Sequence, residues 1–248
     1  MSSHWAAIWT IAKRELSAYF ESPVAYVFLV IFLLLSGFFT FTFGGFFERG
    51  EASLAAFFNW LPWLFLFLVP AAGMRLWSEE RRLGTIELLL TMPVAAWQAI
   101  IGKFLASWLF LIAALALSFP MVVTVNWLGD PDNGVIASGY VGAALLAGAY
   151  LAISCMTSAL TRNQVIAFIL AVLLCLLLIL VGFPPLTDLL ARWASPWLVE
   201  GVAKFSVLTH YDGFQKGVLD SRDLLYFLSV TAYALFATGV VIRNHRTG

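Results

Sequence analysis

The chain has 248 residues, of which 62% are hydrophobic and only 11% are charged, and its formal net charge is zero. A soluble domain of this length cannot bury so much apolar surface, so the composition excludes a water-soluble globular protein and indicates a protein of the lipid bilayer. Because the charges balance, any preference for a charged partner must come from their positions, and no nucleic-acid partner is expected.

The segment before the first long apolar run has apolar residues at helical spacing, while Lys13, Arg14 and Glu15 fall largely away from that stripe. This pattern predicts an amphipathic helix over residues 4–21 that lies in the membrane interface. Pro23 is expected to break it before the first span, since proline lacks an amide hydrogen and disfavours helix in the residue before it. A span that merely starts early is the alternative, which the three adjacent charges disfavour. The stripe consists of Trp5, Ile8, Trp9, Ala12, Leu16, Tyr19 and Phe20.

Six runs without Asp, Glu, Lys or Arg are long enough to cross a bilayer, for which a helix needs about 20 mostly apolar residues. They predict an all-α integral membrane protein with six transmembrane helices. The first run is too long and too far from the amino terminus for a removable signal peptide, so it is expected to stay as an anchor. A shorter run, 88–102, is interpreted as the approach to the third span. The six runs are 22–47, 52–74, 104–129, 133–161, 163–187 and 224–242.

Basic residues beside the spans predict the orientation, because cytoplasmic loops are enriched in Lys and Arg. With a cytoplasmic amino terminus, six crossings also return the carboxyl terminus to the cytoplasm. The cytoplasmic side then collects 9 of the 14 basic residues. They are Lys13, Arg14, Arg75, Arg81, Arg82, Lys103, Arg162, Arg243 and Arg246.

Motifs for chemistry are absent from the sequence. There is no GxxxxGK[ST] loop, HExxH, GxSxG or CxxC, so the chain is not expected to bind nucleotide through a P-loop, to hold a metal or cofactor, or to be an enzyme. His4, His210 and His245 are dispersed along the chain, and Cys155 and Cys175 are expected to be small packing residues. The spans also lack the buried ionisable residues of a proton or ion relay. If the protein moves something, the energy is expected to come from outside this chain.

Two segments are predicted on the outer side of the membrane. GDPDNG, residues 129–134, has the composition of a turn. Residues 188–223 contain Trp193 and Trp197 one helical turn apart and scattered charges, which predict short amphipathic helices at the outer leaflet. A folded external loop anchored by its tryptophans is the alternative.

The stretch MRLWSEERRLGTIELLLTMP is unusually charged for this chain. Ser78 is expected to cap a short helix that Gly84 ends. Thr85 is expected to cap a second helix that has Glu87 in its first turn, where a carboxylate favours the positive end of the helix dipole, and that Pro93 stops.

A positive-inside topology signal alone explains the arginines of this stretch but leaves its glutamates unexplained, because acidic residues add little to that signal. Short capped helices with charge on one face and leucines on the other suit a surface that docks on a soluble partner. Residues 78–93 are therefore predicted to be a cytoplasmic docking region. Its expected docking residues are Glu79, Glu80, Arg81, Arg82 and Glu87, with Gly84, Thr85 and Pro93 shaping the helices.

The run EERRLGTIELLLTMPV resembles the signature E-x-x-x-G-T-x-E-x-L-L-x-x-P of ABC-2 type transporter permeases. The matching positions are Glu80, Gly84, Thr85, Glu87, Leu89, Leu90 and Pro93. The resemblance covers nearly the whole chain, and it extends to the subgroup of the gliding-motility permease GldF. The runs that carry this second likeness are RELSAYFESPVAYVF, FFERG, VNWLGDPDNG and SALTRNQVIAFIL.

The resemblance implies that residues 1–248 form one ABC-2 transmembrane domain in the bacterial inner membrane. It implies an interfacial amino-terminal helix, a coupling helix between the second and third spans, and short outer-leaflet helices between the fifth and sixth. Two permease copies would pair as a homodimer with two copies of a separate ATPase, which binds the ATP and Mg. A membrane-anchored GldG-like auxiliary protein is a further implied partner, and lipids surround the assembly.

Two functions remain open from the sequence. The first is an export permease, in which aromatic residues of the second and fifth spans line the path. The second is a mechanical or scaffolding subunit that passes the ATPase cycle to a periplasmic partner while nothing crosses the bilayer. Membership of a family indicates architecture and energy source more than cargo.

Overall fold

The computed structural model describes residues 2–48, 50, 52–85, 95–192 and 195–244, and every regular element within these ranges is helical. Five helical segments are long and apolar enough to cross a membrane, and a bent pair of helices makes a sixth candidate. The predicted all-α membrane class is therefore confirmed at this level. The five segments are Pro23–Phe43, Ala55–Leu83, Ala96–Leu128, Asn133–Leu160 and Ser221–Asn244.

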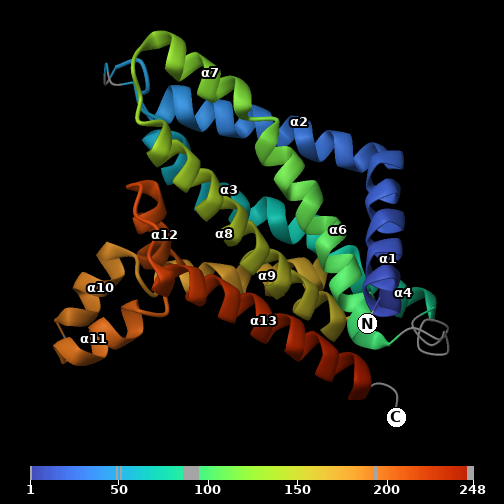
Figure 1. Cartoon of the computed structure of the whole chain (residues 1–248). Helices are drawn as coiled ribbons and strands as arrows, with labels where there is room; N and C mark the ends of the chain where they lie inside the picture. Colours follow the sequence, from blue (N-terminus) through green and yellow to red (C-terminus); the bar gives the residue numbers. More distant parts are fainter. Residues whose placement is uncertain (1, 49, 51, 86–94, 193–194, 245–248) are drawn as a thin grey trace.

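The amino-terminal helix and the first span meet at a corner. α1 (Ser2–Glu21) ends one residue before Ser22, and α2 (Pro23–Phe38) begins with Pro23 in its first turn, where the missing amide hydrogen costs nothing. The chain therefore turns sharply between α1 and α2, and α1 packs along α6 (Figure 1). A π-helical turn, η1 (Phe39–Phe43), extends α2 to the end of the first span.

The apolar stripe predicted for α1 divides into two faces. Ile8 and Ala12 are buried against α6, whereas Trp5 and Trp9 remain exposed. Tryptophan favours the boundary between lipid and water, so the exposed face has the composition of an interfacial helix. That α1 lies in the interface stays a prediction.

Two of the expected spans differ from the observed helices. The third begins with α6 (Ala96–Ala116), so residues 96–102 belong to the helix rather than to an approach, and it continues after a break as α7 (Phe119–Leu128). The fifth is α9 (Gln164–Leu180), which a 62° bend separates from α10 (Pro184–Ala191). Prolines at the start of α10 explain the bend, because they cannot donate the hydrogen bonds that would continue α9.

α8 (Asn133–Leu160) is the central helix of the bundle. It packs against α3 (Ala55–Gly73), α6, α9 and α13 (Ser221–Asn244), and most of its residues are buried (Figure 1). Asp132 caps it, since its carboxylate accepts hydrogen bonds from Gly134 N at 2.8 Å and Val135 N at 3.3 Å. The predicted turn at 129–134 thus leads directly into the first turn of α8. Small residues allow the close packing: Gly148 faces Trp108, whose Nε1 donates to the Ala144 carbonyl at 2.8 Å.

Three short helices follow α9, as expected for residues 188–223, but they do not share one environment. α10 and α11 (Pro196–Ala203) project from the side of the bundle (Figure 1). α12 (Val207–Gln215) instead belongs to the core, because Tyr211 and Phe214 are fully buried against α8. His210 joins α12 to α13: its ring stacks on Tyr226, and its Nδ1 lies 2.7 Å from Asp223.

We expect Gly142→Ala to destabilise the protein. A Cβ at Gly142 would lie 2.5 Å from the Cβ of Phe214, an atom that cannot move without its backbone, so α12 would have to shift from α8. Overpacking of this kind costs about 1–3 kcal/mol. The measurement is the thermal unfolding midpoint of the purified protein in detergent. Gly37→Ala is the matched control, because its Cβ would meet only Met121 at an ordinary 3.8 Å. Equal midpoints for the two variants would contradict the packing described here.

Candidate functional site

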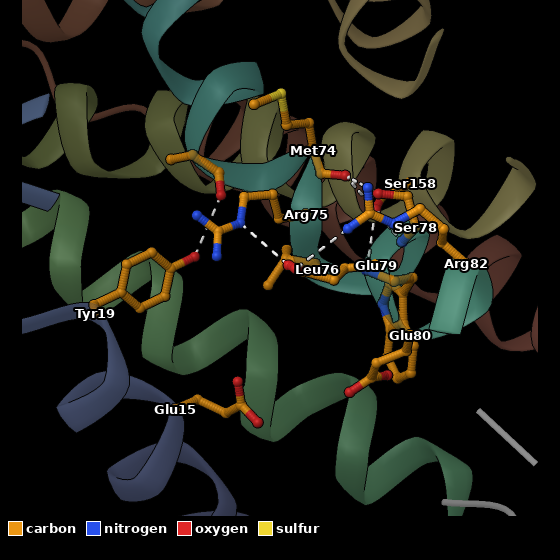
Figure 2. A network of polar contacts seen from close by, with 12 residues as sticks. Glu15, Tyr19, Met74, Arg75, Leu76, Ser78, Glu79, Glu80, Arg82 and Ser158 are labelled. Carbon is orange, nitrogen blue, oxygen red and sulfur yellow. Dashed lines mark hydrogen bonds and ion pairs between the residues drawn. The ribbon is translucent and has the colours of Figure 1, made fainter. Parts of the chain in front are cut away.

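The predicted docking region follows a one-residue break at Met74, between α3 and α4 (Arg75–Leu83). The first turn of α4 is capped from another helix: Ser158 Oγ of α8 accepts hydrogen bonds from Trp77 N and Ser78 N, both at 3.0 Å. The same hydroxyl donates to the Met74 carbonyl at 2.8 Å (Figure 2). One buried side chain of α8 thus satisfies backbone groups at the break and in the first turn of α4, which a helix start otherwise leaves without partners.

The prediction that Ser78 caps this helix is wrong. α4 begins three residues earlier, at Arg75, and the Ser78 hydroxyl turns back to donate to the Met74 carbonyl at 2.6 Å. Ser158, and not Ser78, supplies the oxygen that accepts hydrogen bonds from the first turn of α4, and it lies 80 residues after Ser78 in the sequence. The other predicted boundary is correct: Gly84 ends α4 in the left-handed conformation, with φ of 72°.

An ion-pair cluster joins α4 to α1 and α6. The Lys103 ammonium of α6 lies 2.8 Å from the Glu80 carboxylate and 3.7 Å from that of Glu15 in α1. It also donates to the Leu76 carbonyl at 3.3 Å and lies 5.4 Å from the ring centre of Trp77. Lys103 is only 5% exposed, so two carboxylates, a carbonyl and an aromatic face replace its hydration shell.

Lys103 corrects the expectation that the spans lack buried ionisable residues. It lies inside the observed third span, Ala96–Leu128, whereas the expected span started one residue after it. The burial of Glu80 in this cluster also changes its predicted role. Its side chain points toward Lys103 and is 22% exposed, so it contributes to internal packing as well as to the surface.

Tyr19 closes the same region from α1. Its hydroxyl lies 2.9 Å from Ser107 Oγ and donates to the Ala72 carbonyl at 3.3 Å (Figure 2). Burial raises the pKa of the Tyr19 phenol above its ordinary value, although the hydrogen bond with Ser107 opposes this shift. The phenol therefore stays neutral and keeps its proton for donation at physiological pH.

The remaining charges of α4 form its outer face. Glu79 pairs with Arg75 at 3.3 Å and with Arg82 at 3.8 Å, and the side chains of both arginines are about half exposed. Leu83 beside them is 64% exposed. Arg81 differs, because its guanidinium donates to the Ala159 carbonyl at the end of α8. Four of the predicted docking residues are thus divided into an outer pair, Glu79 and Arg82, and an inner pair, Glu80 and Arg81.

The last part of the predicted region lies outside the described residues. Thr85 is the final residue before this gap, and its amide hydrogen bonds to the Glu80 carbonyl at 3.0 Å as part of the end of α4. Glu87, Pro93 and the second helix expected over 85–93 fall in or extend into residues 86–94, so their roles stay predictions.

Sequence reasoning missed Ser158, Lys103 and Glu15 as partners of α4. A serine in a small-residue span gives no signal, because a buried serine ordinarily bonds within its own helix. Lys103 did give a signal, because a lysine next to a long apolar run is costly to bury if it belongs to the span. Its burial was hidden because the helix was expected to begin after it.

Comparison with known proteins agrees with this architecture. A family model described as "ABC-2 family transporter protein" matches residues 47–198, more than half of the chain. The match begins after the first span, which ends at Phe43, and extends through α4 into α11. A search of curated proteins finds no match.

We expect the Lys103–Glu80 pair to be strongly coupled. Lys103→Met leaves the Glu80 carboxylate without its cation, which costs roughly 1–3 kcal/mol for a poorly satisfied buried group, whereas Lys103→Met with Glu80→Met removes both charges and restores part of that loss. The measurement is a double-mutant cycle on the free energy of unfolding. The control cycle uses Arg75 and Glu79, an exposed pair expected to couple by about 0.2–1 kcal/mol. A coupling no larger than that of the control pair would contradict a central role for Lys103.

Proposed function

Because this chain belongs to the ABC-2 family of transporter proteins, we propose that it is the membrane permease of an ATP-binding cassette exporter, working as a homodimer with two copies of a separate ATPase. The family match over residues 47–198 carries this proposal. Permeases of this family are generally non-enzymatic, multi-pass membrane components, and the family generally implies an ATPase partner. The five or six candidate spans agree with that class.

The ATPase docks, in this proposal, on the outer face of α4 and on the segment that follows it. Two observations support the location. Glu79, Arg82 and Leu83 combine exposed charges of both signs with an exposed apolar side chain, a composition that suits a specific protein contact. Gly84 then ends the helix, and Thr85 and Glu87, two of the residues that match the family signature, follow it in the sequence.

The inner residues of α4 have a different role in the proposal, which is to transmit the docking contact. Glu80 is tied to α6 and α1 through Lys103, and Arg81 is tied to the end of α8. A displacement of the docking face therefore reaches three helices through ion pairs and hydrogen bonds. This division between contact and transmission refines the single docking surface expected from the sequence.

The cellular setting belongs to the same proposal. The likeness to GldF supports an inner-membrane location and a GldG-like auxiliary partner, and the distribution of basic residues supports cytoplasmic chain termini. α1 begins and α13 ends at the same end of the bundle as α4, which is what an even number of crossings requires (Figure 1).

We expect Arg82→Glu to uncouple the transporter. Reversing this exposed charge places a third acidic group next to Glu79 and Glu80 and repels an acidic contact on the ATPase. Permease-stimulated ATP hydrolysis in proteoliposomes is expected to fall about tenfold, which corresponds to the loss of a single close charge contact. The measurement is hydrolysis at equal amounts of assembled complex. Glu87→Lys is expected to act in the same direction.

Arg222→Glu is the matched control for Arg82→Glu. Arg222 is an exposed arginine at the start of α13, at the other end of the bundle, and the same reversal there should leave hydrolysis unchanged. Equal losses in both variants would mean that the effect comes from total charge, and no loss in either would remove α4 from the docking surface.

Thiol labelling tests the proposed orientation. Cys155 and Cys175 are fully buried, so the natural chain should react little with a membrane-impermeant maleimide. Arg82→Cys should react only in inverted vesicles, and Arg222→Cys only in spheroplasts that expose the outer face. The reverse pattern would invert the topology, and labelling of both positions from one side would contradict an odd number of crossings between them.

A further inference from the structure

A cavity of about 500 Å³ lies in the corner between α1 and α2, with α3, α4 and α6 forming its other walls. This volume is typical of ligand sites in proteins. The cavity is open along α2, since two of its wall residues there, Val27 and Ile31, are 56% and 41% exposed at the surface of the protein. A helix of a membrane protein with such residues faces lipid, so the opening leads into the bilayer.

The cavity has an apolar part and a polar part. Val27, Phe28 and Ile31 of α2 and Leu68 of α3 line the apolar part. The polar part lies against α4 and α6, where the ion-pair cluster contributes to the wall. Its charged members are Glu15, Arg75, Glu79, Glu80 and Lys103. A ligand that fills both parts must therefore be an amphiphile with its headgroup toward α4 and its hydrocarbon along α2.

The charges in the polar part favour a headgroup with a cationic donor. Three carboxylates and two cations line this part; Glu15 and Glu79 also pair with Arg14 and Arg82, whereas the ion pair of Glu80 is with Lys103, which Glu15 shares. One oxygen of this cluster, Glu80 Oε2, is buried without a hydrogen-bond partner among the described residues. A buried carboxylate oxygen in that state is unfavourable, and an ammonium N–H is a strong donor to it.

Arg75 provides the complementary group for a phosphate. Its pair with Glu79 uses Nε, and its side chain is 46% exposed at the cavity wall (Figure 2). The two terminal nitrogens of a guanidinium suit the oxygens of a phosphate, which they bind in a bidentate manner. An acceptor for an ammonium group and a donor for a phosphate thus lie at the same end of one open cavity.

We propose that this cavity binds a resident phospholipid whose headgroup carries a primary ammonium. The ammonium donates to Glu80 Oε2, the phosphate accepts from Arg75, and the acyl chains leave along Val27 and Ile31 into the surrounding leaflet. The site belongs to a single protomer and depends on neither an ATPase nor a transport path. The bound lipid would contact α1, α2 and α4 at the same time.

Native mass spectrometry of the purified full chain tests the site with three phospholipids. Phosphatidylethanolamine has an ammonium with N–H donors, phosphatidylcholine has a quaternary ammonium without them, and phosphatidylglycerol has no cation. We expect one phosphatidylethanolamine per protomer, bound about tenfold more tightly than the other two, as the loss of one charge-assisted hydrogen bond predicts. Equal binding of phosphatidylcholine, or preference for phosphatidylglycerol, would overturn the proposal.

Two variants on α2 locate the site. Val27→Trp places an indole in the cavity opening and should weaken phosphatidylethanolamine binding about tenfold, whereas Val30→Trp should not. The two valines are 56% and 55% exposed on the same helix, and of the two only Val27 lines the cavity, so Val30→Trp is the control for adding an exposed indole to α2. Equal binding by both variants would place the lipid elsewhere.

Glu80→Gln tests the donor contact directly. It should reduce the preference for phosphatidylethanolamine over phosphatidylcholine to less than about twofold, because an amide oxygen is a weaker acceptor for an ammonium than a carboxylate. A retained tenfold preference would exclude Glu80 as the partner. All these measurements omit nucleotide and the ATPase, so a failure here is separate from a failure of the proposed permease function.

Discussion

A lysine ammonium placed among apolar helices needs counter-charges and acceptors, because the loss of its hydration is otherwise prohibitive. Lys103 imposes this requirement at the start of α6. Glu80 of α4 and Glu15 of α1 supply the carboxylates, and neither can leave without exposing the other members of the cluster to an unfavourable environment. Three segments that are far apart in the sequence are therefore required to meet at one point. The buried charge joins α1, α4 and α6 at this point, and the packing of Ile8 and Ile11 against Gly102 also holds α1 along α6.

A second requirement acts on the backbone. The break after α3 exposes amide groups in the first turn of α4, and Ser158 of α8 accepts hydrogen bonds from two of them. The two arrangements are complementary: the ion pairs hold the side of α4 that faces α6, and the serine holds its first turn against α8. Glu79 pairs with Arg75 and Arg82 within α4 itself, and it also lines the cavity between α1 and α2. These contacts leave Arg82 and Leu83 exposed, while Glu80 Oε2 on the inner side has no hydrogen-bond partner among the described residues.

Local rules predicted the features that depend on neighbouring residues. The corner at Pro23, the end of α4 at Gly84 and the turn before α8 each follow from the conformational preference of one or two residues, and the structure contains all three. The partners of α4 were beyond such rules, because Ser158 and Lys103 act through space and periodicity does not say which helices are neighbours. The burial of α12 was missed for the same reason: the small residues that admit Phe214 lie in a helix some 70 positions away.

The attachment of α4 to α8 also has a mechanical meaning. α4 has nine residues and is therefore about 13 Å long; Ser158 holds its first turn, and Arg81 in its last turn donates to the Ala159 carbonyl. It is a short rigid helix attached near both ends to the carboxyl-terminal end of α8, the most buried of the described spans. In the proposed permease, a push on α4 acts on α8, which runs unbroken for 28 residues to the turn beside α12. The stiffness of one helix then sets how much of a movement made at one membrane surface arrives at the other.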